Sequence, residues 1–167
     1  NFITEDGSRI LGEALQVNAS INVLGVGKCI VPVDKLRGAG DDHNLALNMR
    51  RSHLHVGGVC VVAGMIARSK NVTSLDLSGN NMHPEGTSAV ALALQTNRSL
   101  HTLVLRDNTL GVDQLNNTEM SGIKAFAKSI GHHPTVTALD LHGNYLRGKL
   151  RPLARDPQAL PFLAISC

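Results

Sequence analysis

The sequence predicts an α/β fold in which short units of strand, turn and helix repeat and stack side by side. Two observations carry this prediction. Apolar residues recur at fixed distances along most of the 167 residues. Aromatic residues make up only 2% of the chain, so the core must consist of Leu, Val, Ile and Ala, which suit many small layers better than one irregular core. Because no single unit can bury its apolar face, the units must stack on one another.

The repeat is measured from the apolar residue that opens each expected strand, which we call the anchor. The anchors are Ile21, Val72, Leu100 and Val136. Apolar residues follow each anchor at three and five positions, a spacing that points alternate side chains of a strand into a core. A glycine precedes each anchor by fourteen positions, and apolar residues precede it by ten and six, which places one apolar stripe on a helix.

A structural asparagine is expected eight residues after each anchor. Asn80, Asn108 and Asn144 occupy this position, Cys29 occupies it in an earlier unit, and Asn1 would occupy it in a truncated first unit. An asparagine amide can both donate and accept hydrogen bonds. A stacked row of these side chains would therefore satisfy turn backbone groups that would otherwise be buried unpaired. Cys29 is a smaller and weaker substitute.

The pattern LxxLxLxxN runs from Val72 to Asn80 and again from Leu100 to Asn108. This pattern resembles the leucine-rich repeat. The anchors Val72 and Leu100 are 28 residues apart, and the helical pattern between them is similar to that of the ribonuclease-inhibitor-like subclass. The resemblance implies a solenoid with a curved parallel sheet on its concave side and helices on its convex side. It also implies that the chain binds a protein partner, although the subclass serves many unrelated partners.

We expect residues 1–167 to form one domain of about five to six units. Neither end carries a recognisable polar cap, and a solenoid with bare ends would be unstable. The chain is therefore expected to be part of a longer polypeptide and of a larger assembly. After Asn144 three prolines disfavour a long helix. This last stretch resembles a shorter, plant-type repeat in which Leu160, Leu163 and Ile165 open one more strand.

Two intervals are longer than the repeat requires. Residues Val33–Gly57 are either a long loop or an extra short unit, whose strand would be Leu45–Leu47 with Arg50 at the asparagine position. Long loops without secondary structure are uncommon, which favours the extra strand. Asp42 would then occupy a buried anchor position, which stands against it. A second insertion, within Gly111–Ser121, enters at the same strand-to-helix edge.

The candidate binding surface comprises the exposed strand positions and the enlarged strand-to-helix edge. In the leucine-rich repeat proteins a protein partner usually binds the concave sheet, and we expect the same here, with the edge loops contributing. The candidates on the strands are Ser74, Asp76, Ser78, Thr102, Arg106, Asp107, Asp140 and His142. The candidates in the edge are Arg37, Arg50 and Arg51.

Several classes of function are disfavoured by the composition. No set of acid, base and nucleophile stands out, so we expect a binding protein rather than an enzyme, with no metal and no cofactor. A net charge of +3 is too weak and dispersed to indicate nucleic acid. The longest apolar run, Val56–Ala67, is too short to span a bilayer. Three cysteines without tight spacing favour a reducing compartment, so we expect a cytoplasmic protein.

Two alternatives remain open at this point. Ran GTPase-activating proteins have similar repeats and place an arginine in an enlarged strand-to-helix loop, where it stabilises charge during GTP hydrolysis. Arg37 lies in such a loop. An extracellular recognition domain is the second alternative, because four asparagines match the glycosylation pattern. These asparagines are Asn18, Asn71, Asn97 and Asn116.

Overall fold

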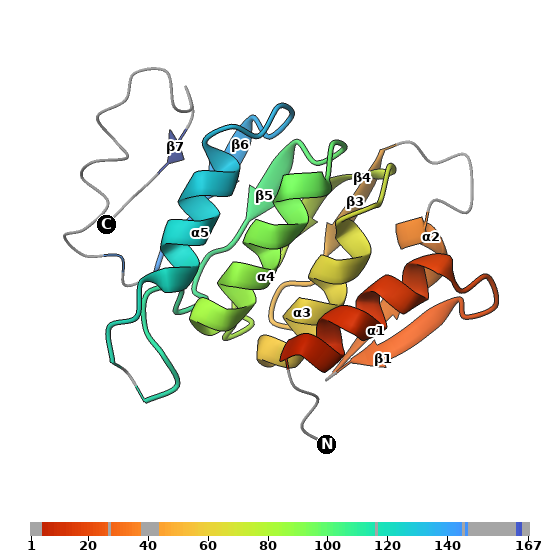
Figure 1. The fold of residues 1–167 in the computed structure, drawn as a ribbon, viewed down its shortest axis with the longest axis horizontal. Coiled ribbons are helices and arrows are strands. Elements are labelled where there is room, and N and C mark those ends of the chain that lie inside the picture. The colour runs from red at the N-terminus through yellow and green to blue at the C-terminus, as the bar shows by residue number, and fades with distance from the viewer. Residues whose placement is uncertain are drawn as a thin grey trace.

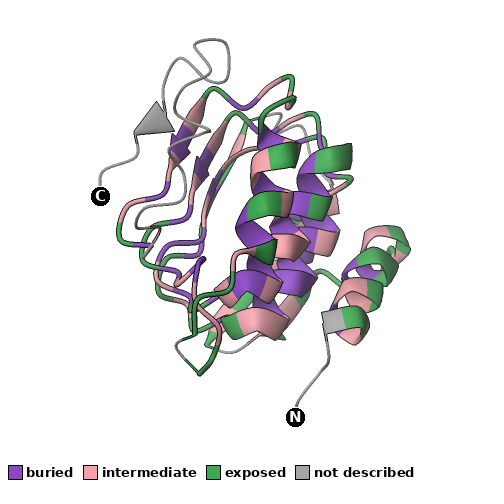
Figure 2. Cartoon of the chain, turned by 60° about the vertical axis from the view of Figure 1, so that its left-hand side comes forward, coloured by how far each residue is buried: buried purple, intermediate pink, exposed green. Residues whose placement is uncertain are grey.

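The computed structural model describes residues 5–26, 28–37, 44–115, 117–144, 146 and 163–164. Within these ranges the chain forms a five-stranded parallel sheet with helices along one of its faces (Figures 1 and 2). A separate pair of antiparallel strands lies near the N-terminus. The mixed α/β architecture with a parallel sheet agrees with the prediction from the repeat.

The strands of the parallel sheet follow one another in chain order. They are β3 (Leu45–Asn48), β4 (Val72–Asp76), β5 (Thr102–Val104), β6 (Ala138–Asp140) and β7 (Leu163–Ala164). Each repeat position pairs with the same position of the next unit, so that Leu47, Leu75, Leu103 and Leu139 stand level. The ladder continues past the ends of the strands, because the N–H of Met49 donates to Asp76 O and that of Leu77 to Val104 O.

Three helices cover one face of the sheet (Figure 2). They are α3 (His55–Ile66), α4 (His83–Thr96) and α5 (Ser121–Ile130). The repeated apolar positions form the core between the layers: Leu75, Leu103 and Leu139 from the strands and Ile66, Leu94 and Ile130 from the helices are all buried. Among the described residues no helix is both long and apolar enough to cross a membrane.

The N-terminal part of the chain departs from the predicted repeat. It forms α1 (Glu5–Val17), β1 (Val23–Val26), β2 (Cys29–Pro32) and the short α2 (Val33–Arg37). The expected helix before Ile21 is present, but the strand after it pairs antiparallel with β2 and lies outside the parallel sheet. Ile21 is 40% exposed, so it is not a buried anchor.

The reason for this difference is local. Only two residues of the sequence separate Val26 from Cys29, and the second apolar run can pair directly with the first. Antiparallel strands can be joined by such a short connection, whereas parallel strands need a crossover. The assignment of Cys29 to the asparagine row was therefore wrong: Cys29 is a strand residue opposite Val26. Asn1 lies outside the described residues.

We call residues 5–26 and 28–37 the N-terminal module. It packs on the β3–α3 end of the array, where the sequence showed no recognisable cap. Helix α1 contacts α3 at a pair of glycines: a Cβ on Gly12 would lie 2.6 Å from Val61 O and 3.1 Å from Cα of Gly64. This contact explains why α3 is apolar nearly all round, since a helix without a polar face needs partners on several sides.

The interval before β4 contains the extra strand, so the prediction of a short extra unit was right and that of a long loop was wrong. Its predicted register was off by two residues. Leu47 and Met49 are the buried strand positions, and the pairing shifts between Leu45 and Ala46. Arg50 is therefore level with Ser78, and Ser52 stands at the asparagine position instead.

The other two departures from the repeat lie toward the C-terminus. Residues 111–115 and 117–120 form a small hairpin-like excursion with a bridge between Val112 and Thr118 (Figure 1). Strand β7 pairs with β6 with Leu163 opposite Leu139, as the predicted spacing requires. Leu160 and Ile165 lie outside the described residues.

The close approach of α1 to α3 can be tested by Gly12→Ala. Because the added Cβ meets backbone rather than a flexible side chain, we expect a net loss of about 1–2 kcal/mol in unfolding free energy, even though alanine favours helix. Equilibrium denaturation measures this loss. Gly25→Ala is the control, since a Cβ on Gly25 has nothing within 4 Å. Equal stability of the two variants would contradict the glycine contact.

Candidate partner-binding surface

Three buried asparagines determine where the strands end. The Nδ2 atoms of Asn80, Asn108 and Asn144 donate to carbonyl oxygens of the preceding unit, at 2.8 Å to Met49, 2.9 Å to Leu77 and 2.7 Å to Leu105. Their Oδ1 atoms accept from backbone N–H groups of the preceding unit in the same order: Leu54 at 3.2 Å, Asn80 at 2.8 Å and Asn108 at 2.7 Å. Each asparagine thus joins two adjacent turns, and we call this row the asparagine ladder.

The face of the sheet opposite the helices, which we call the open face, presents side chains in level rows. One row contains Ser74 and Thr102, and the next contains Asp76 and Asp140. A third row follows just beyond the strands, where the backbone ladder continues. Its members are Arg50, Ser78, Arg106 and His142. Apart from Arg37, the structure brings all the predicted partner-binding residues to this face and to the turns that follow its strands.

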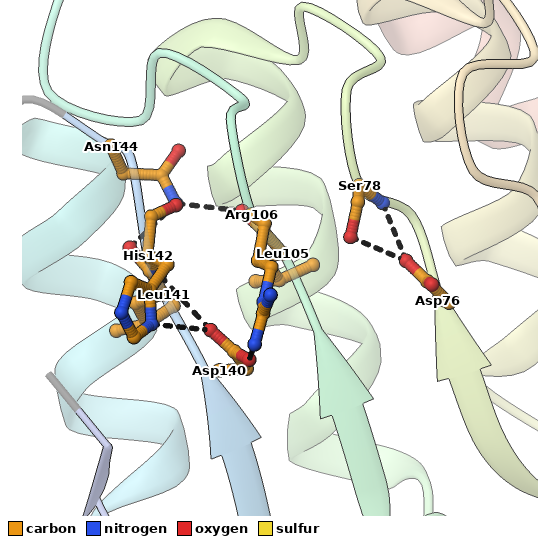
Figure 3. A network of polar contacts seen from close by, with 8 residues as sticks. All are labelled: Asp76, Ser78, Leu105, Arg106, Asp140, Leu141, His142 and Asn144. Atoms are coloured by element: carbon orange, nitrogen blue, oxygen red, sulfur yellow. Dashed lines mark hydrogen bonds and ion pairs between the residues drawn. The ribbon is translucent and has the colours of Figure 1, made fainter. Parts of the chain in front are cut away.

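A recurrent polar contact follows the strands β3, β4 and β6. The side-chain oxygens of Asn48, Asp76 and Asp140 accept from the backbone N–H two residues later, at 3.0, 2.8 and 3.1 Å. Ser78 Oγ adds a hydrogen bond of 2.5 Å to Asp76 (Figure 3). Strand β5 departs from this pattern, because Val104 occupies the level position. The role of Asn48 was not predicted, because it becomes visible only in the correct register of β3.

An ion pair joins β5 and β6 at this edge. Nε and Nη2 of Arg106 both lie 2.5 Å from Oδ2 of Asp140, and Nδ1 of His142 lies 3.2 Å from Oδ1 (Figure 3). Burial alone raises the pKa of Asp140, but the hydrogen bonds from Arg106 and from the backbone and ring of His142 outweigh it and hold the pKa below 3.8. The hydrogen bond to Asp140 raises the pKa of Arg106.

Arg51 and Asp107 follow the third row at corresponding turn positions. Both have a φ of 53°. The same position of the next unit is a glycine in each case: Gly79 follows Arg51 with a φ of 68°, and Gly143 follows Asp107 with a φ of 70°. A Cβ on Gly79 would lie 2.9 Å from Cγ of Arg51, and one on Gly143 would overlap Oδ1 of Asp107. The two charged side chains therefore extend over glycines of the neighbouring turns, where any side chain would displace them.

Arg37 lies elsewhere. Its guanidinium donates to Ile21 O at 2.7 Å and to Leu15 O at 3.5 Å, so it holds α2 to the end of α1 and the start of β1. These contacts occupy the arginine within the N-terminal module. No observation on the described residues favours the role that the resemblance to Ran GTPase activators implied for Arg37.

Two of the four glycosylation patterns lie inside the fold. Asn97 is 1% exposed and Asn71 is 8% exposed. Nδ2 of Asn97 donates to Ile66 O at 2.8 Å and to Ser69 O at 3.2 Å. A glycan cannot be attached to an amide held in this way without opening the core. Asn18 is half-buried, and Asn116 lies outside the described residues.

The ion pair predicts a specific acid dependence. Because the pKa of Asp140 is lowered in the folded protein, its stabilising contribution is present at neutral pH and is lost as the pH falls through the folded pKa. We expect Arg106→Gln to raise the pKa of Asp140, as followed by NMR titration of its carboxyl carbon. Arg50 occupies the same repeat position after β3 as Arg106 does after β5, and Arg50→Gln should leave the pKa of Asp140 unchanged. An equal pKa in wild type and Arg106→Gln would contradict the pairing.

Comparison with known proteins identifies the repeat. The leucine-rich repeat family profile matches residues 68–91, which include β4 and the first part of α4. Leucine-rich repeat-containing protein 45 of Gallus gallus is 32% identical over 89 residues, covering 53% of this chain and 12% of that protein. Protein CARMIL of Dictyostelium discoideum is 44% identical over 43 residues, covering 26% of this chain and 4% of that protein. The chain thus matches only a small part of each relative.

A solved structure has the same type of fold. The actin-binding site 2 of leiomodin-1 superposes with a TM-score of 0.51 at 14% sequence identity, covering 66% of this chain and 59% of that one. At this identity the likeness concerns the fold alone. The profile identifies a leucine-rich repeat at residues 68–91, and the relatives and the parallel sheet are consistent with further repeats of this type beside it.

Proposed function

We propose that this chain is a protein-interaction module without catalytic activity, and that its partner binds across the open face and the strand-to-helix edge. The observation that carries the proposal is that side chains at matching positions of neighbouring strands form rows across that face. Short polar side chains and charged side chains from β3 to β6 and the turns after them lie in register there, and no helix of the described residues covers them (Figure 2).

The open face suits a protein partner because it is already ordered. Ser74 and Thr102 have short side chains on paired strands, so little conformational entropy is lost when they become buried. Arg106 is held by Asp140 in one orientation, and arginine is among the residues that dominate binding energy in protein interfaces. We propose Arg106 as the central contact, with Asp76, Asp107, Asp140, His142, Arg50 and Arg51 around it. Ser78 is only 2% exposed and its hydroxyl donates to Asp76, so we do not retain it as a contact.

The comparisons support this proposal at the level of fold and give a first partner to test. The leiomodin-1 region is named as an actin-binding site, so actin is the first candidate. The chain corresponds to 12% or less of the two sequence relatives, which supports a module within a larger scaffold. The repeat length and the full helices α3 and α4 support the ribonuclease-inhibitor-like subclass and a curved solenoid.

We place the module in the cytoplasm. The two buried glycosylation patterns at Asn71 and Asn97 support this location over the extracellular alternative. The side chain of Asn97 has a structural role in the turn between helix and strand, which explains that pattern without a glycan.

A photo-crosslinking amino acid tests the binding face. We expect the probe at Thr102 to give protein adducts in cell extract, and the same probe at the exposed Lys35 of α2 to give none of them. Arg106→Glu should then weaken binding of the purified adduct protein about tenfold or more, while Lys35→Glu, with the same charge change, should not. Adducts that form equally from both positions, or unchanged affinity of Arg106→Glu, would refute the open-face proposal. Actin should be assayed first.

A further inference from the structure

The opposite edge of the array, where helices end and strands begin, is strongly basic. We call Arg68, Lys70, Arg98, His101, Lys128 and His132 the basic edge. All six side chains are exposed. The ion pairs found among the described residues are Arg9 with Glu13 and both Arg106 and His142 with Asp140. Within the described part of the chain, no carboxylate therefore forms an ion pair with the basic edge, although Asp6 and Glu13 line a neighbouring pocket with Arg68.

Two clefts open along this edge. The larger, of about 540 Å³, is lined by Arg68, Lys70, Arg98 and His101. The smaller, of about 310 Å³, is lined by Arg98, Lys128, His132 and His133. Arg98 lines both, so the clefts are neighbours along one edge. Hydroxyl-bearing residues complete the larger cleft: Ser69, Thr73, Thr96 and Ser99.

Helix capping explains only part of this charge. The guanidinium of Arg98 donates to the carbonyl oxygens of Asn97 at 2.6 Å and Gln95 at 2.9 Å, which stabilises the end of α4. Arg68, Lys70 and Lys128 make no side-chain hydrogen bond or ion pair with the described residues. Their positive charge is therefore available to a ligand.

We propose that the basic edge binds an acidic peptide segment of a partner protein, with its carboxylates in the two clefts. Positive groups around a concave site attract and concentrate an anionic ligand. Nucleic acid is disfavoured because no Phe, Tyr or Trp is found among the described residues that line the two clefts, where such a ring would offer a base its broadest stacking surface. A membrane surface is disfavoured because the cations surround clefts, with no large exposed apolar side chain between them.

This site is separate from the proposed open-face site. The basic edge lies where the strands begin, and the charged rows of the open face lie where they end. The two sites can therefore be occupied together and lost separately. Failure of one proposal leaves the other standing.

The test uses a fluorescein-labelled poly-glutamate peptide, followed by fluorescence anisotropy at low salt. The variant is Arg68→Gln with Lys70→Gln and Lys128→Gln. The control is Lys28→Gln with Lys35→Gln and Lys124→Gln, which removes the same charge from exposed lysines elsewhere. We expect wild type and control to bind alike and the variant to bind at least about tenfold more weakly. Circular dichroism and thermal unfolding establish that all three proteins are folded.

Parallel measurements with poly-glutamine of equal length, phosphatidylserine vesicles and oligothymidine distinguish the ligand classes. The proposal predicts that poly-glutamate binds most tightly of the four. It is overturned by absent binding of poly-glutamate, by equal losses in the two triple variants, or by tighter binding of vesicles or oligothymidine.

Discussion

The buried amide of asparagine is the constraint on which the rest of the structure depends. Each turn after a strand carries backbone groups that the sheet cannot satisfy, and an unpaired buried backbone group costs about 1–3 kcal/mol. Asn80, Asn108 and Asn144 satisfy these groups in two adjacent units at once. Because every unit is tied to the next in this way, the strands end level, and the side chains at their ends form rows.

The repeat made much of the fold predictable, because it links apolar spacing to a strand and a helix. The anchors Val72, Leu100 and Val136 are all buried where the spacing requires. The incorrect predictions concern residues whose positions were determined by local strand pairing or by core packing. Cys29 entered a hairpin with a nearby run of strand-forming residues, and Met49 displaced Leu45 as a core position, which moved Arg50 two places. Neither outcome depends on repeat spacing, so the pattern could not reveal it.

The candidate sites also differ in how far the sequence alone could predict them. Side-chain alternation alone placed Ser74, Asp76, Thr102 and Asp140 on one face. The link between Arg106 and Asp140 joins residues 34 positions apart and needed the register of β5 and β6. The basic edge was invisible in the net charge of +3, because it forms only when stacking gathers residues from three units at one edge. The other edge carries both signs of charge, with Arg106 paired to Asp140. The distribution of charge, rather than its total, gives the molecule two distinct surfaces.

The most direct test of this account is the unfolding free energy of Asn108→Ala beside that of Asn22→Ala. Asn108 is 0% exposed, and its side-chain amide accepts from the N–H of Asn80 and donates to Leu77 O and Arg106 O. Asn22 is an exposed residue before β1. The account predicts a loss of about 2–4 kcal/mol for Asn108→Ala and little change for Asn22→Ala. A loss at Asn108 no larger than that at Asn22 would contradict the central role of the asparagine ladder.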